Sequence, residues 1–84
     1  MSSIDNLRMS IDMKPVEISH YELYKAIAYR DGMQFQKMYD TLKKNKDKIL
    51  DEDIWNELMA KCCQKLGKHE EAKSSIEALL KKFP

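Results

Sequence analysis

Two stripes of apolar side chains that meet at a glycine constrain the fold of this chain more than any other feature. Both stripes lie between Asp51 and Pro84 and recur at intervals of three and four residues, the period of a helix with one buried face. The first consists of Trp55, Leu58, Met59, Cys62, Cys63 and Leu66, and the second of Ala72, Ile76, Leu79, Leu80 and Phe83. Gly67 follows the first stripe, where a left-handed C-cap ends a helix, and the pattern therefore predicts a helical hairpin.

The composition favours a single all-α domain. A chain of 84 residues holds one hydrophobic core, and two glycines with two prolines are too few for a turn-rich sheet fold. Fifteen basic and fourteen acidic residues give a net charge of +1, so no single sign dominates the surface as it does in small nucleic-acid binders.

A second hairpin is predicted upstream. Ser19 and Glu22 form a capping box that starts a helix, and Gly32 offers a left-handed cap at its end. Asp51 is the predicted cap of the third helix. We expect hairpins at about 19–47 and 51–83 in a domain of residues 16–84, with 1–15 as an N-terminal arm or half-repeat helix from about Ser3 to Asp12. We also assign Tyr24, Met38 and Tyr39 to the core, together with Met59 of the first stripe.

The two hairpins match one another along the chain. Glu22-Leu23 corresponds to Glu57-Leu58, and Gly32 to Gly67, at an offset of thirty-five residues. A period of this length is typical of helix-turn-helix repeats. We therefore expect two antiparallel helical hairpins stacked as a short right-handed repeat, with the first helix of each hairpin along one groove.

The last hairpin resembles a tetratricopeptide repeat at Met59-Ala60, Cys63, Gly67, Ala72, Ile76, Leu79 and Pro84. Two junctions are similar to those between pentatricopeptide repeats: Met13-Lys14-Pro15 followed by His20-Tyr21, and Ile49-x-Asp51 followed by Trp55–Met59. The first resemblance implies a peptide or protein ligand. The second implies single-stranded RNA, with Asn56 and Tyr21 at base-reading positions.

Our leading interpretation is a non-catalytic protein–protein interaction or assembly module that binds a peptide, a partner subunit or neighbouring repeats. The alternative is a pentatricopeptide-like RNA-binding segment. Polar positions off the core stripes predict a cationic groove for an acidic peptide: Lys25, Arg30, Asn56, Lys61 and Lys65. Four apolar residues are hard to bury in two hairpins, so some of them are expected to face a partner: Tyr21, Tyr29, Met33 and Phe35.

No residue pattern indicates an enzyme, a cofactor or a metal site. His20 and His69 lack ligand or triad partners at suitable spacing, and the acidic groups lie at helix starts, where the helix dipole explains them. Adjacent Cys62 and Cys63 are expected to be buried thiols of a reducing intracellular compartment, the cytoplasm, with the mitochondrion as the alternative. No apolar run approaches the ~20 residues of a membrane span.

Overall fold

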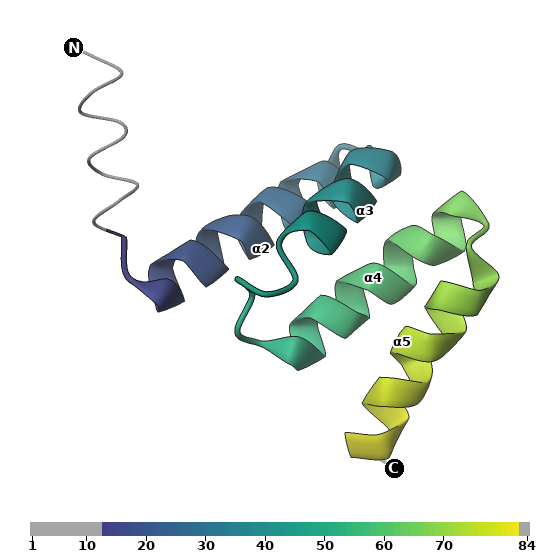
Figure 1. The fold of residues 1–84 in the computed structure, drawn as a ribbon. Coiled ribbons are helices and arrows are strands. Elements are labelled where there is room, and N and C mark those ends of the chain that lie inside the picture. The colour runs from purple at the N-terminus through teal and green to yellow at the C-terminus, as the bar shows by residue number, and fades with distance from the viewer. Residues whose placement is uncertain (1–12, 83–84) are drawn as a thin grey trace.

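The computed structural model describes residues 13–82, which form four helices and no strand (Figure 1). The helices are α2 (Pro15–Asp31), α3 (Phe35–Lys44), α4 (Glu52–Leu66) and α5 (His69–Lys82). The predicted all-α class is confirmed for these residues. The helix predicted from Ser3 to Asp12 lies outside them. None of the described helices is long and apolar enough to cross a membrane.

Each helix packs against the next one along the chain, and α2 also touches α4 over a shorter stretch. Figure 1 shows α4 in the middle, between the pair formed by α2 and α3 on one side and α5 on the other. Since α4 contacts all three other helices, it is the central element of the described structure.

Helix α2 begins four residues before the predicted capping box. Pro15 is at the start of the helix, where its fixed φ is favourable and its missing N–H is not needed, and Lys14 before it is extended (φ −75°, ψ 156°). Ser19 does not cap the helix. It is buried, and its Oγ instead accepts a hydrogen bond of 2.8 Å from the backbone N–H of Leu50. The predicted helix start at Ser19 is therefore wrong.

The two glycines that end the first helices behave differently. Gly67 has φ 77° and forms the predicted left-handed cap of α4. Gly32 has φ −86°, and the following residue, Met33, takes the left-handed conformation with φ 59°. The prediction of a left-handed cap at Gly32 is thus wrong by one residue. At the start of α4 the predicted cap is confirmed, because Asp51 Oδ1 accepts from the N–H of Ile54 at 3.2 Å.

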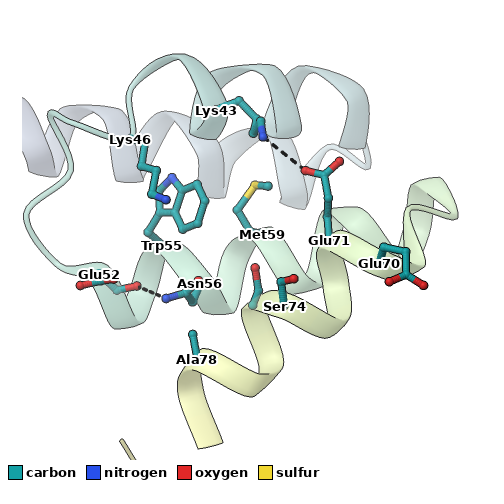
Figure 2. A pocket seen from close by; sticks show the side chains of 11 residues that line it. Lys43, Lys46, Glu52, Trp55, Asn56, Met59, Glu70, Glu71, Ser74 and Ala78 are labelled. Carbon is teal, nitrogen blue, oxygen red and sulfur yellow. Dashed lines mark hydrogen bonds and ion pairs between the residues drawn. The ribbon is translucent and has the colours of Figure 1, made fainter. Parts of the chain in front are cut away.

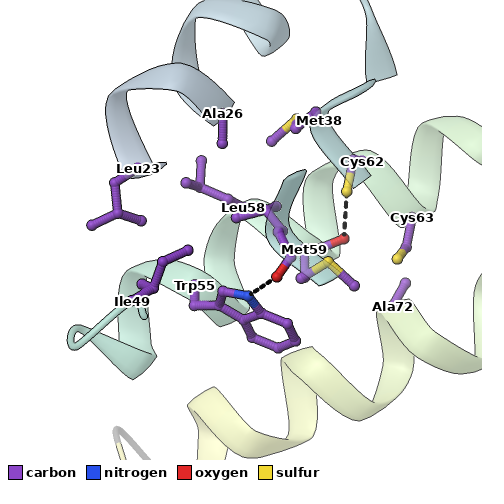
Figure 3. Packing of buried hydrophobic residues seen from close by; sticks show 11 residues of the cluster. Leu23, Ala26, Met38, Ile49, Trp55, Leu58, Met59, Cys62, Cys63 and Ala72 are labelled. Atoms are coloured by element: carbon purple, nitrogen blue, oxygen red, sulfur yellow. Dashed lines mark hydrogen bonds between the residues drawn. The ribbon is translucent and has the colours of Figure 1, made fainter. Parts of the chain in front are cut away.

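The core lies between α4 and the other helices (Figure 3). Its members are Leu23, Ala26, Met38, Leu42, Ile49, Trp55, Leu58, Met59, Cys62, Cys63 and Ala72. Met38 and Met59 are buried as predicted, and Tyr39 packs against the cluster from its edge. Tyr24 is 66% exposed, so its assignment to the core is wrong.

One side-chain hydrogen bond ties α4 to the end of α3 inside this core. Trp55 Nε1 donates to the backbone oxygen of Leu42 at 2.8 Å, and both groups are buried. The indole therefore fills core volume and also satisfies a carbonyl in the last turn of α3, which has no partner within the helix.

The buried positions of α2 and α4 for the most part do not follow the offset of thirty-five residues that we expected from the sequence. At an offset of thirty-five, buried Glu22 would correspond to exposed Glu57, and exposed Tyr24 to buried Met59. An offset of thirty-six matches all four buried residues of α2 with buried residues of α4: Ser19 with Trp55, Glu22 with Leu58, Leu23 with Met59, and Ala26 with Cys62. Exposed Tyr24 then corresponds to buried Ala60.

Candidate functional site

Helix α2 buries polar side chains and exposes aromatic ones. Its buried residues are Ser19, Glu22, Leu23 and Ala26. Its opposite side, which we call the outer face of α2, has residues at alternating intervals of four and three, all of them exposed: Glu17, Tyr21, Tyr24, Ala28 and Asp31. Tyr21 is 54% exposed and Tyr24 66%. Two large aromatic rings therefore lie on the solvent side of a helix that is otherwise anchored in the core.

Lys25 contacts one residue on the buried side of α2 and one on its outer face. Its Nζ lies 5.0 Å from the centre of the Tyr21 ring and 3.1 Å from Oε1 of the buried Glu22. The ammonium thus compensates a buried carboxylate and at the same time contacts the aromatic face of Tyr21. Of the predicted binding residues, Tyr21 and Lys25 are brought together here.

The other predicted apolar contacts divide into two groups. Met33 is 75% exposed in the turn between α2 and α3. Tyr29 and Phe35 instead pack against the core and are only partly exposed. Of the four residues expected to include a partner-binding surface, Tyr21 and Met33 are therefore the accessible ones.

The predicted cationic residues do not form one line. Arg30 and Lys61 line a shared cavity of about 450 Å³ between α2, α4 and α5, together with Glu57. The Nε of Arg30 lies 3.4 Å from Asp31 Oδ1, so part of its charge is compensated. Lys65 is exposed but does not belong to this cavity lining. The geometry brings together only two of the five predicted groove residues.

Asn56 lies on a different side of α4 from Lys61. We predicted a polar position off the core stripe, but Asn56 is buried and its Nδ2 donates to the backbone oxygen of Glu52 at 3.1 Å. That part of the prediction is wrong.

Asn56 instead lines a groove of about 430 Å³ between α3, α4 and α5 (Figure 2). Lys43 and Lys46 lie on one wall, and Glu70 and Glu71 on the other. Lys46 Nζ lies 4.8 Å from the centre of the Trp55 ring. Sequence reasoning missed this groove because its walls come from two separate segments, the residues at the end of α3 and the start of α5. We had attributed the acidic residues at the helix starts to the helix dipole alone.

A polar cluster joins the two walls of this groove. Tyr39 Oη donates to the carboxylate of Glu71, with oxygen–oxygen distances of 2.8 and 2.9 Å, and Lys43 Nζ lies 3.4 Å from Glu71 Oε2. The hydrogen bond to Glu71, and then burial, raise the pKa of Tyr39 to about 12. The same hydrogen bond and the nearby Lys43 lower the pKa of Glu71, although burial acts in the opposite direction.

The cysteines are buried and free, as predicted. Burial, followed by the neighbouring Cys63, raises the pKa of Cys62 to about 12, and burial also raises the pKa of Cys63. Since the thiolate is the reactive form, neither side chain is activated as a nucleophile. Among residues 13–82, no three histidine, cysteine or acidic side chains are grouped so that they would hold a metal ion.

No family model, curated protein or solved structure matches this chain.

Proposed function

We propose that this chain is a protein-interaction module built from two helical hairpins of the tetratricopeptide type, and that its partner packs on the outer face of α2. One observation carries the proposal: α2 keeps Ser19 and Glu22 inside while Tyr21 and Tyr24 are outside. Two large aromatic rings next to one another on the exposed side of a helix are typical of a surface that a partner covers.

The chemistry of the outer face suits a protein partner. Tyrosine is enriched where proteins meet, because its ring provides a large apolar area at a low cost in side-chain entropy and its hydroxyl can still find a polar partner. Ala28 continues the same stripe and leaves room for close approach of another backbone. A partner that covers the stripe therefore removes two half-exposed aromatic rings from water.

The arrangement of the helices supports the hairpin-repeat part of the proposal. Helices α2 and α3 pack together, as do α4 and α5, and α3 packs against α4. The matching burial of α2 and α4 gives both first helices an outward side: Tyr21 in α2 corresponds to Glu57 in α4, and Ala28 to Gln64, all exposed. A partner that follows one first helix to the next would reach the cavity lined by Arg30 and Lys61.

The experiment compares the full chain with a double variant, Tyr21→Ser and Tyr24→Ser, as baits in cell extract with and without ribonuclease. Leu80→Ser, at a similarly exposed apolar residue on α5, is the matched control. We expect the double variant to lose protein partners that both the unmodified chain and the control retain. Thermal unfolding should be similar for all three, because the substituted side chains are exposed and loss of the contact between Lys25 and Tyr21 costs only about 0.5–1 kcal/mol.

Two results would overturn this proposal. One is an unchanged set of captured proteins with the double variant, which would show that the outer face is not used. The other is capture that disappears after ribonuclease treatment, which would favour the RNA-binding alternative.

A further inference from the structure

A second exposed apolar surface lies where the link between α3 and α4 meets the start of α2. Four aliphatic side chains line one cavity of about 500 Å³ here, and three of them are substantially exposed: Val16 (48%), Leu50 (61%) and Ile54 (37%). We call these three residues the Leu50 patch. None of them belongs to the outer face of α2, so this surface is separate from the one proposed above.

The backbone beneath the patch is held by hydrogen bonds on both sides of Leu50. Ser19 Oγ accepts from the N–H of Leu50 at 2.8 Å, and Asp51 Oδ1 accepts from the N–H of Ile54 at 3.2 Å. Ile49, next to Leu50, is buried in the core. Leu50 is thus presented to solvent by a well-anchored segment, and little ordering is required before a partner binds.

The charged groups around the patch favour a cation. Asp51, Glu52 and Asp53 line the same cavity, and Lys82 is the one lysine or arginine in its lining. Lys82 Nζ already lies 3.1 Å from Asp53 Oδ2, so this rim holds an ammonium group within the chain itself. His20, the remaining titratable group in the lining, is on α2. The positive end of the α4 dipole attracts anions, but three carboxylates at that position would repel them.

We propose that the Leu50 patch binds an amphipathic segment of another protein, one whose aliphatic side chains are flanked by lysine or arginine. The aliphatic side chains cover Val16, Leu50 and Ile54, and the cations lie against Asp51 and Glu52. Apolar contact provides most of the affinity, and the carboxylates select against acidic segments. This inference does not depend on the outer face of α2.

The test uses two short synthetic helical peptides, one of leucine and lysine and one with glutamate in place of every lysine, titrated into the labelled full chain by NMR. We expect only the lysine peptide to bind, with the largest amide shifts at Val16, Leu50 and Ile54. Leu50→Ser should weaken binding about tenfold. Leu80→Ser, an equally exposed leucine on α5, should leave it unchanged.

Equal binding of the glutamate peptide would overturn the proposal, as would shifts centred elsewhere or unchanged affinity of Leu50→Ser. If Leu50→Ser unfolds the chain, Ile54→Ser provides the same comparison from the adjacent helix. The variant with Tyr21→Ser and Tyr24→Ser should bind the lysine peptide normally. That result separates failure of this inference from failure of the function proposed for the outer face.

Discussion

Helices α2 and α4 each pack against the helix that follows them, but they differ in what they bury. At an offset of thirty-six residues, α4 has buried Trp55, Leu58, Met59 and Cys62 where α2 has buried Ser19, Glu22, Leu23 and Ala26. α4 therefore supplies much of the apolar core and is covered on three sides, while the buried side of α2 is smaller and more polar. The difference teaches that α4 holds the fold together through its apolar side chains, whereas α2 leaves two aromatic rings exposed to solvent.

The largest expected effect comes from truncating a core side chain of α4. Leu58 is 4% exposed, and Leu58→Ala should lower the free energy of unfolding by about 2–5 kcal/mol, because it removes buried apolar area and leaves a cavity. Tyr24→Ala on the outer face of α2 should change it by no more than about 0.5 kcal/mol. Urea unfolding followed by circular dichroism measures both. Similar losses of unfolding free energy for the two variants would contradict the conclusion that α4 stabilises the fold more than the outer face of α2 does.

The next effect tests whether the polar residues buried in α2 stabilise the fold. Ser19→Ala leaves the N–H of Leu50 without its acceptor and should cost about 1–2 kcal/mol in urea unfolding. Ser74→Ala, at an exposed serine of α5, is the control and should have little effect. A Ser19 variant as stable as the control would show that this hydrogen bond does not hold the link to α2.

The two glycines that follow these helices provide a third comparison. Gly67→Ala should lose about 1 kcal/mol of stability because a side chain is strained at φ 77°. Gly32 has a negative φ, and the nearest atom to an added Cβ would be 3.5 Å away. Gly32→Ala should therefore leave stability unchanged or raise it by up to about 1 kcal/mol. Equal destabilisation at both positions would contradict the different caps of α2 and α4.

The smallest effect concerns pH and the contact between α3 and α5. The pKa of Glu71 is lowered in the folded chain. The ionised carboxylate therefore stabilises the fold at pH values above its ordinary pKa of 4.5, and this stabilisation is lost as the pH falls through the pKa of the folded state. The pKa of Tyr39 is raised from 10.0 to about 12. The protonated hydroxyl therefore stabilises the fold fully below pH 10.0, and this stabilisation is lost as the pH rises through about 12.

The stability of the fold against pH is measured as the urea concentration at the midpoint of unfolding. Tyr39→Phe should reduce the loss of stability at both the acidic and the alkaline end of this curve. Both effects should be small because solvent screens the groups. Tyr21→Phe is the matched control, since Tyr21 is exposed and forms no hydrogen bond to a carboxylate within residues 13–82. An identical profile for Tyr39→Phe and the unmodified chain would mean that the Tyr39–Glu71 bond does not contribute.

The sequence pattern was most informative where a local signal and an apolar stripe agreed. Asp51 as a cap, Gly67 as a left-handed residue and buried Met59, Cys62 and Cys63 were predicted and are found. Each depends on neighbours within one or two helical turns. The pattern was misleading at Ser19, because a serine three residues before a glutamate looks the same whether its hydroxyl caps its own helix or binds Leu50, thirty-one residues away.

The candidate site was only partly predictable for a related reason. The structure places four of the candidate residues outside the buried core, as we expected, but buries Asn56: the four are Tyr21, Lys25, Arg30 and Lys61. Arg30 and Lys61 line the same cavity only because of the way α2 packs against α4. No pattern in the sequence predicts the Leu50 patch. Its members come from three segments, and none of them looks unusual within its own segment.

The amino-acid order alone determined that this polypeptide is helical, where most of its helices end, and which side of α4 is apolar, because these follow from backbone propensity, capping and periodicity. Only the tertiary structure decided which side of α2 is buried. Periodicity shows which residues of a helix lie on the same side. Which side becomes buried depends on the elements that pack against the helix, and for α2 these are α3, α4 and the segment held by Ser19.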